Sequence, residues 1–383
     1  MKIGVLTYFW AENPGTFLQA YSMLKALERR FLNDQVELVN YRHRWVYFKP
    51  GRSNVTFRQF IRDFKRYLIY ERMKKKYLVT SNDQLITRDS ERAWKFIEDQ
   101  QYDLIVVGSD TMLELLSFHY RDGSIPVYWL PTRLNCKKVM CAASAGAMTY
   151  EQLNNNQRDA CKKSINSFDL IGVRDDATYT LIEMLGLEDK SKLQMVPDPT
   201  FTFDIDYTYA ERFVHKLNID FSRPTIALFL HRTFKPAAEV AAYFRSKGFQ
   251  VLSLNAARYA DFCLTDISPF EWAGIYRDLR LVITGAFHGT VFSLKNLIPV
   301  VSVAHEKRLI TNEGLSKYYS LLKQFGLHNS NLINGIDHRD AGTVIEVAER
   351  AVCNFNRQMV RKRNRQLRDE FNAFADKVVC LLD

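Results

Sequence analysis

The stretch that decides the fold runs from Leu281 to Val303 and reads LVITGAFHGTVFSLKNLIPVVSV. It begins with an apolar, β-branched run, passes through a short loop into a helical pattern, and ends in a second apolar run. Apolar strands joined by a helix are typical of a parallel sheet covered on both faces. One ionisable ring, that of His288, lies where the first strand gives way to the helix. The stretch therefore predicts a parallel sheet with a candidate functional residue at its edge.

The same alternation of strand and helix extends over most of the chain. Apolar strands are expected at 2–8, 35–41, 102–110, 137–146 and 169–176, and again at 225–231, 249–255, 279–285 and 298–303. The Pro- and aromatic-rich stretch 196–213 separates the two series. We therefore expect an α/β protein with two Rossmann-like, doubly wound domains. The expected boundaries are 1–205 for the first domain, 206–345 for the second, and 346–383 for a C-terminal helix that packs back on the body.

Length and composition limit the class of protein. The chain has 383 residues, 47% of them apolar and 25% charged, which suits a globular protein of two domains. No apolar run approaches the roughly 18 residues of a membrane span, and we find no secretory signal. The six cysteines show no metal-binding spacing, so we expect no metal and a reduced, cytoplasmic setting. Cys141 and Cys263 have apolar neighbours and are expected in the core.

The formal net charge of +10 favours an anionic partner, which could be nucleic acid, an anionic membrane or a phosphorylated substrate. Basic residues concentrate in the insert 41–80, where aromatic and aliphatic residues also follow helical spacing. Such a helix can lie on an anionic bilayer, or it can cap the first domain and bury its aromatic stripe. In the C-terminal helix, an apolar stripe from Val360 to Val378 lies opposite a basic face and is expected to pack on the body.

Candidate residues of the first domain follow its strands, because ligands of parallel α/β sheets bind beyond the carboxyl ends of the strands. Asn13, Pro14 and Gly15 form a turn after the first strand, and Thr16 is expected to cap the next helix. The amides at that helix start could bind an anion or a sugar hydroxyl, although turn chemistry alone also explains the motif.

Two further strand ends of the first domain carry charged residues. Asp110 follows the third strand and could act as a base, bind sugar hydroxyls or simply cap a helix. Arg174 follows the fifth strand and needs an anionic partner, either a ligand or a structural carboxylate such as Asp175 or Asp198. The small residues after the fourth strand, in AASAG, permit the close approach of a neighbour or ligand.

The second domain offers two histidines at strand ends. His231 and Arg232 come directly after one strand, and His288 comes after another. Because Gly289 and Thr290 follow His288, the ring should lie beside helix amides that can hold a phosphate. Imidazole titrates near neutral pH, so this combination suits acid–base work on a phosphorylated substrate.

Taken in order, the motifs resemble the polysaccharide pyruvyl transferase family. The resemblance rests on six motifs between about residues 2 and 305: KIGVLTYFWAENPGTFLQAYSM, YDLIVVGSD, VMCAASAG, IGVRDDATYTLIEMLG, VPDPTF and LVITGAFHGTVFSL. It implies a GT-B-like pair of Rossmann-like domains. It also implies transfer of the enolpyruvyl group of phosphoenolpyruvate onto two hydroxyls of a sugar, which leaves a cyclic ketal and phosphate and needs no cofactor. The expected acceptor belongs to a bacterial surface polysaccharide precursor linked to a lipid diphosphate, so the enzyme could associate with the inner face of the membrane.

The resemblance also suggests roles for residues. Acid–base and anion-binding chemistry would fall to His288, Arg174 and Asp110. The expected donor-binding residues are Gly289, Thr290, Arg232, His231 and Lys307. The expected acceptor-binding residues are Asn13, Gly15, Gln19, Ser109 and Ser144. Many family members carry Arg or Ser where this chain has Ala286, so Arg232, Lys307 or Arg308 would have to supply that cation here.

Two other functions fit parts of the sequence. A GT-B glycosyltransferase would use the same fold and histidine, with Glu306 or Glu313 as candidates to hold the ribose of a nucleotide sugar. A nucleic-acid-binding protein would fit the net charge, but no helix-turn-helix, zinc-finger or RNA-recognition signature is present. The sequence also has no GxxxxGK[ST], GxGxxG, HExxH or GxSxG motif, which argues against P-loop and serine hydrolase chemistry.

Overall fold

A computed structural model describes residues 1–43, 57–115, 124–230, 234–253, 257–304, 316–334 and 340–382, with backbone alone at 57–59. The chain divides into two compact units. The first contains the described residues of Met1–Thr56, Glu71–Phe203 and Leu367–Asp383, and the second contains those of Phe57–Tyr70 and Asp204–Gln366. The segment 57–70, which the sequence assigned to the first domain, therefore groups with the second unit.

The first unit is built on a six-stranded sheet in the order β2-β1-β5-β6-β7-β8, and every pair in it is parallel. Its strands are β1 (Lys2–Leu6), β2 (Gln35–Leu38), β5 (Leu104–Val107), β6 (Lys137–Ala143), β7 (Leu170–Val173) and β8 (Leu193–Met195). A separate parallel pair joins β3 (Tyr41–His43) and β4 (Leu85–Thr87). Since β2 and β5 flank β1 on opposite sides, the sheet reverses its winding between β1 and β5.

The second unit has its own six-stranded parallel sheet, in the order β11-β10-β9-β12-β13-β14. Its strands are β9 (Thr225–Phe229), β10 (Gln250–Ser253), β11 (Phe262–Cys263), β12 (Leu281–Thr284), β13 (Val300–Ala304) and β14 (Leu332–Asn334). Here the winding reverses between β9 and β12. Each sheet thus has one switch point, which is where ligands of doubly wound proteins bind.

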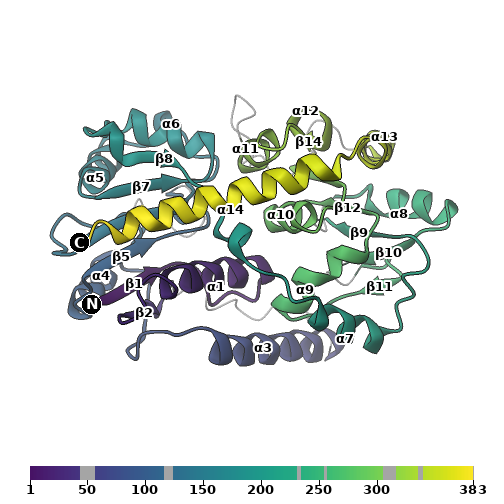
Figure 1. Cartoon of the computed structure of the whole chain (residues 1–383), viewed down its shortest axis with the longest axis horizontal. Coiled ribbons are helices and arrows are strands. Elements are labelled where there is room, and N and C mark those ends of the chain that lie inside the picture. The colour runs from purple at the N-terminus through teal and green to yellow at the C-terminus, as the bar shows by residue number, and fades with distance from the viewer. Residues whose placement is uncertain are drawn as a thin grey trace. The chain divides into compact units, whose positions relative to one another are not determined.

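Helices connect the strands (Figure 1). The first unit contains α1 (Pro14–Glu28), α4 (Ser90–Asp99), α5 (Asn155–Asn166) and α6 (Asp176–Met184). The second contains α7 (Tyr207–Leu217), α8 (Ala237–Ser246), α9 (Pro269–Ile275), α10 (Phe287–Lys295), α11 (Lys317–Lys323), α12 (His328–Asn331) and α13 (Ala341–Cys353). Two long helices, α3 (Phe57–Tyr77) and α14 (Arg357–Val379), contribute residues to both units. Short 3₁₀ turns lie at 150–152, 190–192, 199–202 and 276–278.

The strands predicted from the sequence are all present, and the central ones are buried along their whole length. In β5, β7, β9 and β12 every residue is buried. Continuous apolar runs of this kind are expected where helices cover both faces of a parallel sheet. The sequence did not indicate the short strands β3, β4, β8, β11 and β14, each of two or three residues.

The C-terminal region forms two helices, α13 and α14, where the sequence suggested one. The apolar stripe of α14 is buried as expected, with Leu367, Phe371 and Phe374 at most 2% exposed. The ring of Phe374 lies so close to Gly172 of β7 that a Cβ there would come within 2.7 Å of it. Glycine at 172 therefore allows α14 (yellow in Figure 1) to pack directly against the backbone of β7.

Two expectations about burial are wrong. Cys263 is exposed rather than in the core, because it lies on β11, the last strand at one edge of its sheet. The apolar stripe of α3 is also exposed, with Phe60 at 61% and Phe64 at 50%, so of the two alternatives for this helix the burial of the stripe against a domain does not hold. No helix among the described residues is long and apolar enough to cross a membrane.

Candidate functional site

The switch point of the first sheet is occupied by the segment that follows β5. Gly108 has a φ of +138°, and a Cβ there would lie only 1.9 Å from the carbonyl oxygen of Cys141 on β6. Only glycine fits, and it turns the chain so that Asp110 follows with a φ of +101°. A positive φ is uncommon for a residue other than glycine, and such positions cluster at functional sites. The backbone therefore marks Asp110 as a candidate functional residue.

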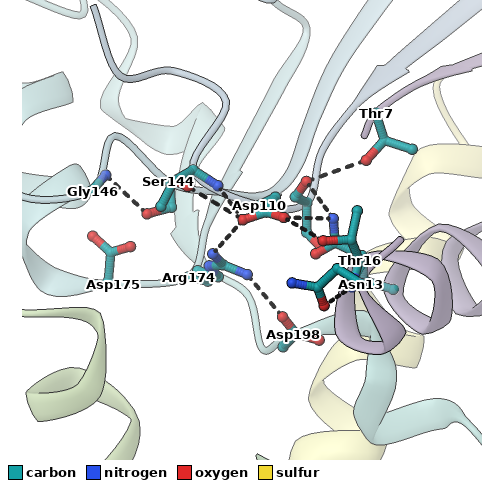
Figure 2. A network of polar contacts seen from close by, with 12 residues as sticks. Thr7, Asn13, Thr16, Asp110, Ser144, Gly146, Arg174, Asp175 and Asp198 are labelled. Carbon is teal, nitrogen blue, oxygen red and sulfur yellow. Dashed lines mark hydrogen bonds and ion pairs between the residues drawn. The ribbon is translucent and has the colours of Figure 1, made fainter. Parts of the chain in front are cut away.

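The start of α1 holds one oxygen of the Asp110 carboxylate (Figure 2). Oδ2 accepts hydrogen bonds from Gln19 Nε2 at 3.2 Å and from Thr16 Oγ1 at 3.4 Å. Gln19 is fully buried and also accepts a hydrogen bond from Ser109 Oγ at 3.0 Å, so both neighbouring residues are tied to the same helix. The other oxygen, Oδ1, accepts from the amide of Thr111 at 2.7 Å. The carboxylate is thus fixed in orientation while its side chain stays 17% exposed.

Arg174, which follows β7, lies between two carboxylates in Figure 2. Its Nη1 donates to Asp198 Oδ2 at 2.9 Å, and both side chains are 2% exposed. Its Nη2 lies 3.5 Å from Asp110 Oδ1. The structural ion pair that the sequence left open for Arg174 is therefore present, and it involves Asp198 and Asp110.

The other carboxylate considered for this pairing, that of Asp175, has a different structural role. It caps α6, with its Oδ1 accepting from the amide of Thr178 at 2.8 Å and from the hydroxyl of the same residue at 2.6 Å. Asp198 is held by Thr200, whose hydroxyl and amide donate to Oδ1 at 2.6 and 3.0 Å. Because Oδ1 of Asp198 is engaged in this way, its Oδ2 faces the guanidinium.

Several of the predicted acceptor-binding residues support this cluster. Asn13, not Thr16, caps α1, and its Oδ1 accepts from the amides of Gly15 at 2.9 Å and of Thr16 at 3.3 Å. The amide of Gly15 is therefore already bonded within the helix start. Ser109 and Ser144 are 1% and 0% exposed. Ser144 donates its amide to the carbonyl oxygen of Asp110 at 3.0 Å, so it positions that residue's backbone.

The thiol beneath this cluster is buried. Cys141, on β6, is 2% exposed, and burial raises the pKa of its thiol well above the ordinary value. Cys141 is therefore a core residue, as the sequence predicted. Among the described residues, no group of three His, Cys, Asp or Glu side chains is placed to hold a metal ion.

The switch point of the second sheet carries His288. The chain leaves β12 through Thr284, whose hydroxyl accepts from the amide of Ala286 at 3.0 Å. Ala286 is the N-cap residue of α10 and has no side chain to bond the first amides of the helix. His288 is the second residue of this helix and is half-buried. The first amides of a helix have no carbonyl partner one turn earlier, so α10 presents donors beside the ring.

Gly289 and Thr290 have structural roles. A Cβ on Gly289 would lie 2.4 Å from Thr284 Oγ1, so glycine is required where α10 packs against the end of β12. The Thr290 hydroxyl is 2.7 Å from Ser302 Oγ on β13, and both side chains are fully buried. The Thr290 amide donates to the carbonyl of Ala286 at 3.2 Å. The expectation that Thr290 offers a free amide to a donor is therefore wrong, because the first helical hydrogen bond uses it.

The sequence analysis missed Lys317 and Tyr318, at the start of α11. The Tyr318 hydroxyl donates to the carbonyl of Gly285 at 2.8 Å. Lys317 Nζ lies 5.6 Å from the ring centre of Phe287, the first residue of α10. A cation thus lies close to the start of α10, where the N-cap residue Ala286 supplies no polar side chain. A lysine far along the chain gives no local signal of this proximity.

The remaining candidates lie outside the described residues. These are His231 and Arg232, which follow β9, together with Lys307, Arg308, Glu306 and Glu313. The predicted roles of these six residues remain predictions. His288 belongs to the second unit, and Arg174 and Asp110 belong to the first.

Solved structures with a similar fold include two epimerases and a synthase. UDP-GlcNAc 2-epimerase from Neisseria meningitidis, bound to UDP-GlcNAc, matches at 7% identity and a TM-score of 0.55 over 100% of both chains. The UDP-GlcNAc 2-epimerase from Methanocaldococcus jannaschii matches at 10% identity and 0.56, over 93% of this chain and 94% of that one. Sucrose-phosphate synthase from Thermosynechococcus elongatus matches at 11% identity and 0.51, over 100% of this chain and 98% of that one. Identities this low establish the fold alone, and they confirm the predicted GT-B-like class.

Comparison with curated protein sequences gives no match. The model of one family, described as polysaccharide pyruvyl transferase, matches residues 13–307. The match covers most of the 383-residue chain and includes Asp110, Arg174 and His288. The chain therefore belongs to the polysaccharide pyruvyl transferase family.

Proposed function

We propose that this protein transfers the enolpyruvyl group of phosphoenolpyruvate onto two hydroxyls of a sugar, forming a cyclic pyruvate ketal and releasing phosphate. The acceptor is proposed to be a lipid-diphosphate-linked precursor of a bacterial surface polysaccharide. The observation that carries the proposal is the family match over residues 13–307, combined with ionisable residues at both switch points. The reaction as written uses no cofactor.

In this proposal the first unit binds the uncharged hydroxyl groups of the acceptor sugar. Asp110 and Asp198 surround the single guanidinium of Arg174, so the cluster keeps one negative charge. A trianionic donor would be repelled by that charge, whereas a sugar hydroxyl can donate a hydrogen bond to it. Asp110 is the more exposed carboxylate, at 17% against 2% for Asp198, and is assigned as the base. Arg174 then acts as a positioning residue that holds Asp110.

The second unit is proposed to handle the donor. His288 protonates the methylene carbon of phosphoenolpyruvate, because an imidazolium can act as a general acid. The opening amides of α10 and the ammonium of Lys317 bind the donor's phosphate or carboxylate. Lys317 thereby takes the place of the cation that Ala286 cannot supply.

The reaction begins at the donor. The electrons of the enol double bond take a proton from His288 at the methylene carbon, which becomes a methyl group and leaves C2 electrophilic. The first sugar hydroxyl attacks C2 and gives its proton to Asp110. The bond from C2 to the phosphate oxygen then breaks, the second hydroxyl adds to C2, and its proton passes to the departing phosphate. The proton held by Asp110 then passes through solvent to His288, which restores both residues. One phosphate is released for each ketal formed.

The proposal is tested by measuring phosphate release from phosphoenolpyruvate with a panel of lipid-linked saccharides that have neighbouring free hydroxyls. His288→Gln and Asp110→Asn should each lower kcat/KM by about 10²–10⁴-fold, which is the usual contribution of a general acid or base. His215→Gln and Asp99→Asn change exposed residues of the same types on α7 and α4 and should leave the rate unchanged. Wild-type rates in both site variants would refute the assignment of roles. Turnover of a nucleotide sugar in place of phosphoenolpyruvate would refute the proposed function.

A further inference from the structure

The helix α3 exposes an unusual amount of apolar surface. Phe60, Ile61, Phe64 and Leu68 are 61%, 38%, 50% and 48% exposed, and they lie within nine consecutive residues. The spacings of three, four and seven residues between them place all four on one side of the helix. The rings of Phe60 and Phe64 stack at 6.3 Å. We call these four residues the α3 stripe.

The other side of α3 anchors it to the protein. Tyr70 is 1% exposed, and Arg66, Met73 and Tyr77, which lie on the same side of the helix at spacings of three, four and seven residues from it, are half-buried. The buried and exposed residues therefore alternate with helical period, and the apolar stripe is on the outward side. Ordinary packing would place apolar residues inward, and large exposed apolar patches mark interaction sites.

The charges of α3 indicate what would cover the stripe. The helix carries eight Lys or Arg residues and two acidic ones, within a chain of net charge +10. Lys65 and Arg72 lie one turn beyond Ile61 and Leu68, and both are exposed. Lys75, also exposed, lies two turns beyond Leu68 on the same side. Basic side chains thus border the apolar stripe and extend beyond it.

We propose that the outward side of α3 docks onto a bilayer that contains anionic phospholipid. Helices with an apolar side bordered by Lys and Arg lie in the plane of a membrane surface, with the apolar side among the headgroups and upper acyl chains. A second copy of this chain would bring two strongly basic helices together, which is unfavourable. Nucleic acid would neutralise the charges but would leave the aliphatic residues of the stripe uncovered. An anionic bilayer would both cover the apolar residues of the stripe and neutralise the basic side chains beside it.

This inference stands apart from the proposed reaction, because vesicle binding needs neither donor nor acceptor. The full chain is sedimented with vesicles of phosphatidylcholine alone and with vesicles that also contain phosphatidylglycerol. We expect binding to the anionic vesicles and strong weakening at about 1 M salt, where the Debye length falls to about 3 Å. Each basic residue close to an anionic surface raises affinity about fivefold, so the triple variant Lys65→Gln, Arg72→Gln, Lys75→Gln should bind about 10²-fold more weakly.

The stripe is tested by the double variant Phe60→Ser, Phe64→Ser, which should weaken binding at least about tenfold. Leu32→Ser is the matched apolar control, since Leu32 is 81% exposed but lies outside α3. Arg361→Gln, Lys362→Gln is the matched charge control on the exposed face of α14. Both controls should bind vesicles like wild type and, like the α3 variants, keep the wild-type circular dichroism spectrum.

Three results would overturn the inference. Equal binding to neutral and anionic vesicles would show that the basic side chains of α3 do not select an anionic bilayer. Wild-type vesicle binding by the α3 variants would place the contact elsewhere. A lipid-free dimer that dissociates in the Phe60→Ser, Phe64→Ser variant, together with no vesicle binding, would assign the stripe to a second copy of the chain.

Discussion

Replacing Arg174 with methionine should destabilise the first unit strongly. The guanidinium donates to Asp198 at 2.9 Å with both side chains 2% exposed, and it lies 3.5 Å from Asp110. Methionine fills a similar volume but carries no charge. Its introduction leaves two carboxylates facing each other at the edge of the sheet, and one of them has almost no access to water.

The size of the effect follows from that burial. Removing one partner of a buried ion pair costs about 3–5 kcal/mol, because the remaining charge is left without compensation. Asp110→Asn should cost less than about 1.5 kcal/mol, since Asp110 is 17% exposed and its distance to Arg174 is 3.5 Å. The double variant Arg174→Met, Asp198→Asn also removes the unpaired negative charge of Asp198. It should recover at least about half of the free energy of unfolding that Arg174→Met loses.

The test is urea unfolding of the full chain, followed by far-UV circular dichroism. It compares the wild type, Arg174→Met, Asp110→Asn and the double variant Arg174→Met, Asp198→Asn. The double variant distinguishes an ion pair from simple packing, because lost packing would not be restored by Asp198→Asn. A loss below about 1 kcal/mol in Arg174→Met, or no recovery in the double variant, would refute the reasoning.

Three other predictions concern separate parts of the molecule. Gly289→Ala should lower the free energy of unfolding by about 1–3 kcal/mol, because its Cβ would lie 2.4 Å from Thr284 Oγ1; an unchanged urea midpoint would contradict this. Cys263 should react rapidly with a thiol reagent in the native protein, while Cys141 should stay unmodified until unfolding, because burial protects it and raises the pKa of its thiol. Peptide mass mapping after labelling distinguishes the two. Lys317→Gln should raise KM for phosphoenolpyruvate at least about fivefold with little change in stability, and an unchanged KM would remove Lys317 from the donor site.

The strands of both sheets were predictable because each is an apolar run bounded by turns. β5, with the sequence LIVV, and β12, with LVIT, are buried at every position, so sequence and burial agree. The short strands β8, β11 and β14 were not predictable, because two or three residues carry no periodicity. They add to the edges of sheets that are already specified.

Local sequence was a poorer guide to helix caps and surfaces. Asn13 and Thr16 are both good capping residues, and only the observed start at Pro14 shows that Asn13 holds the position. The α3 stripe has the spacing of a buried helix face, yet it is exposed. Periodicity reveals which residues share a side of a helix, but it does not reveal whether that side faces the core, a membrane or water.

The sequence indicated candidate residues at strand ends, but it did not indicate how their side chains pair. Strand ends in a parallel sheet pointed to Asp110, Arg174 and His288. The ion pair between Arg174 and Asp198 spans 24 positions, and Asp175 was an equally good partner by sequence. Lys317 lies still further from its neighbour Phe287, and the two are brought together by the packing of α11 near α10. Contacts of this kind depend on the tertiary fold.

The most direct test of the central claim is a calorimetric titration of the wild-type protein with phosphoenolpyruvate and, separately, with UDP-N-acetylglucosamine. Neither titration needs the acceptor sugar. The account predicts saturable binding of phosphoenolpyruvate that is weakened by Lys317→Gln and is retained by Asp110→Asn, together with no binding of the nucleotide sugar. Saturable binding of UDP-N-acetylglucosamine with none of phosphoenolpyruvate would contradict it.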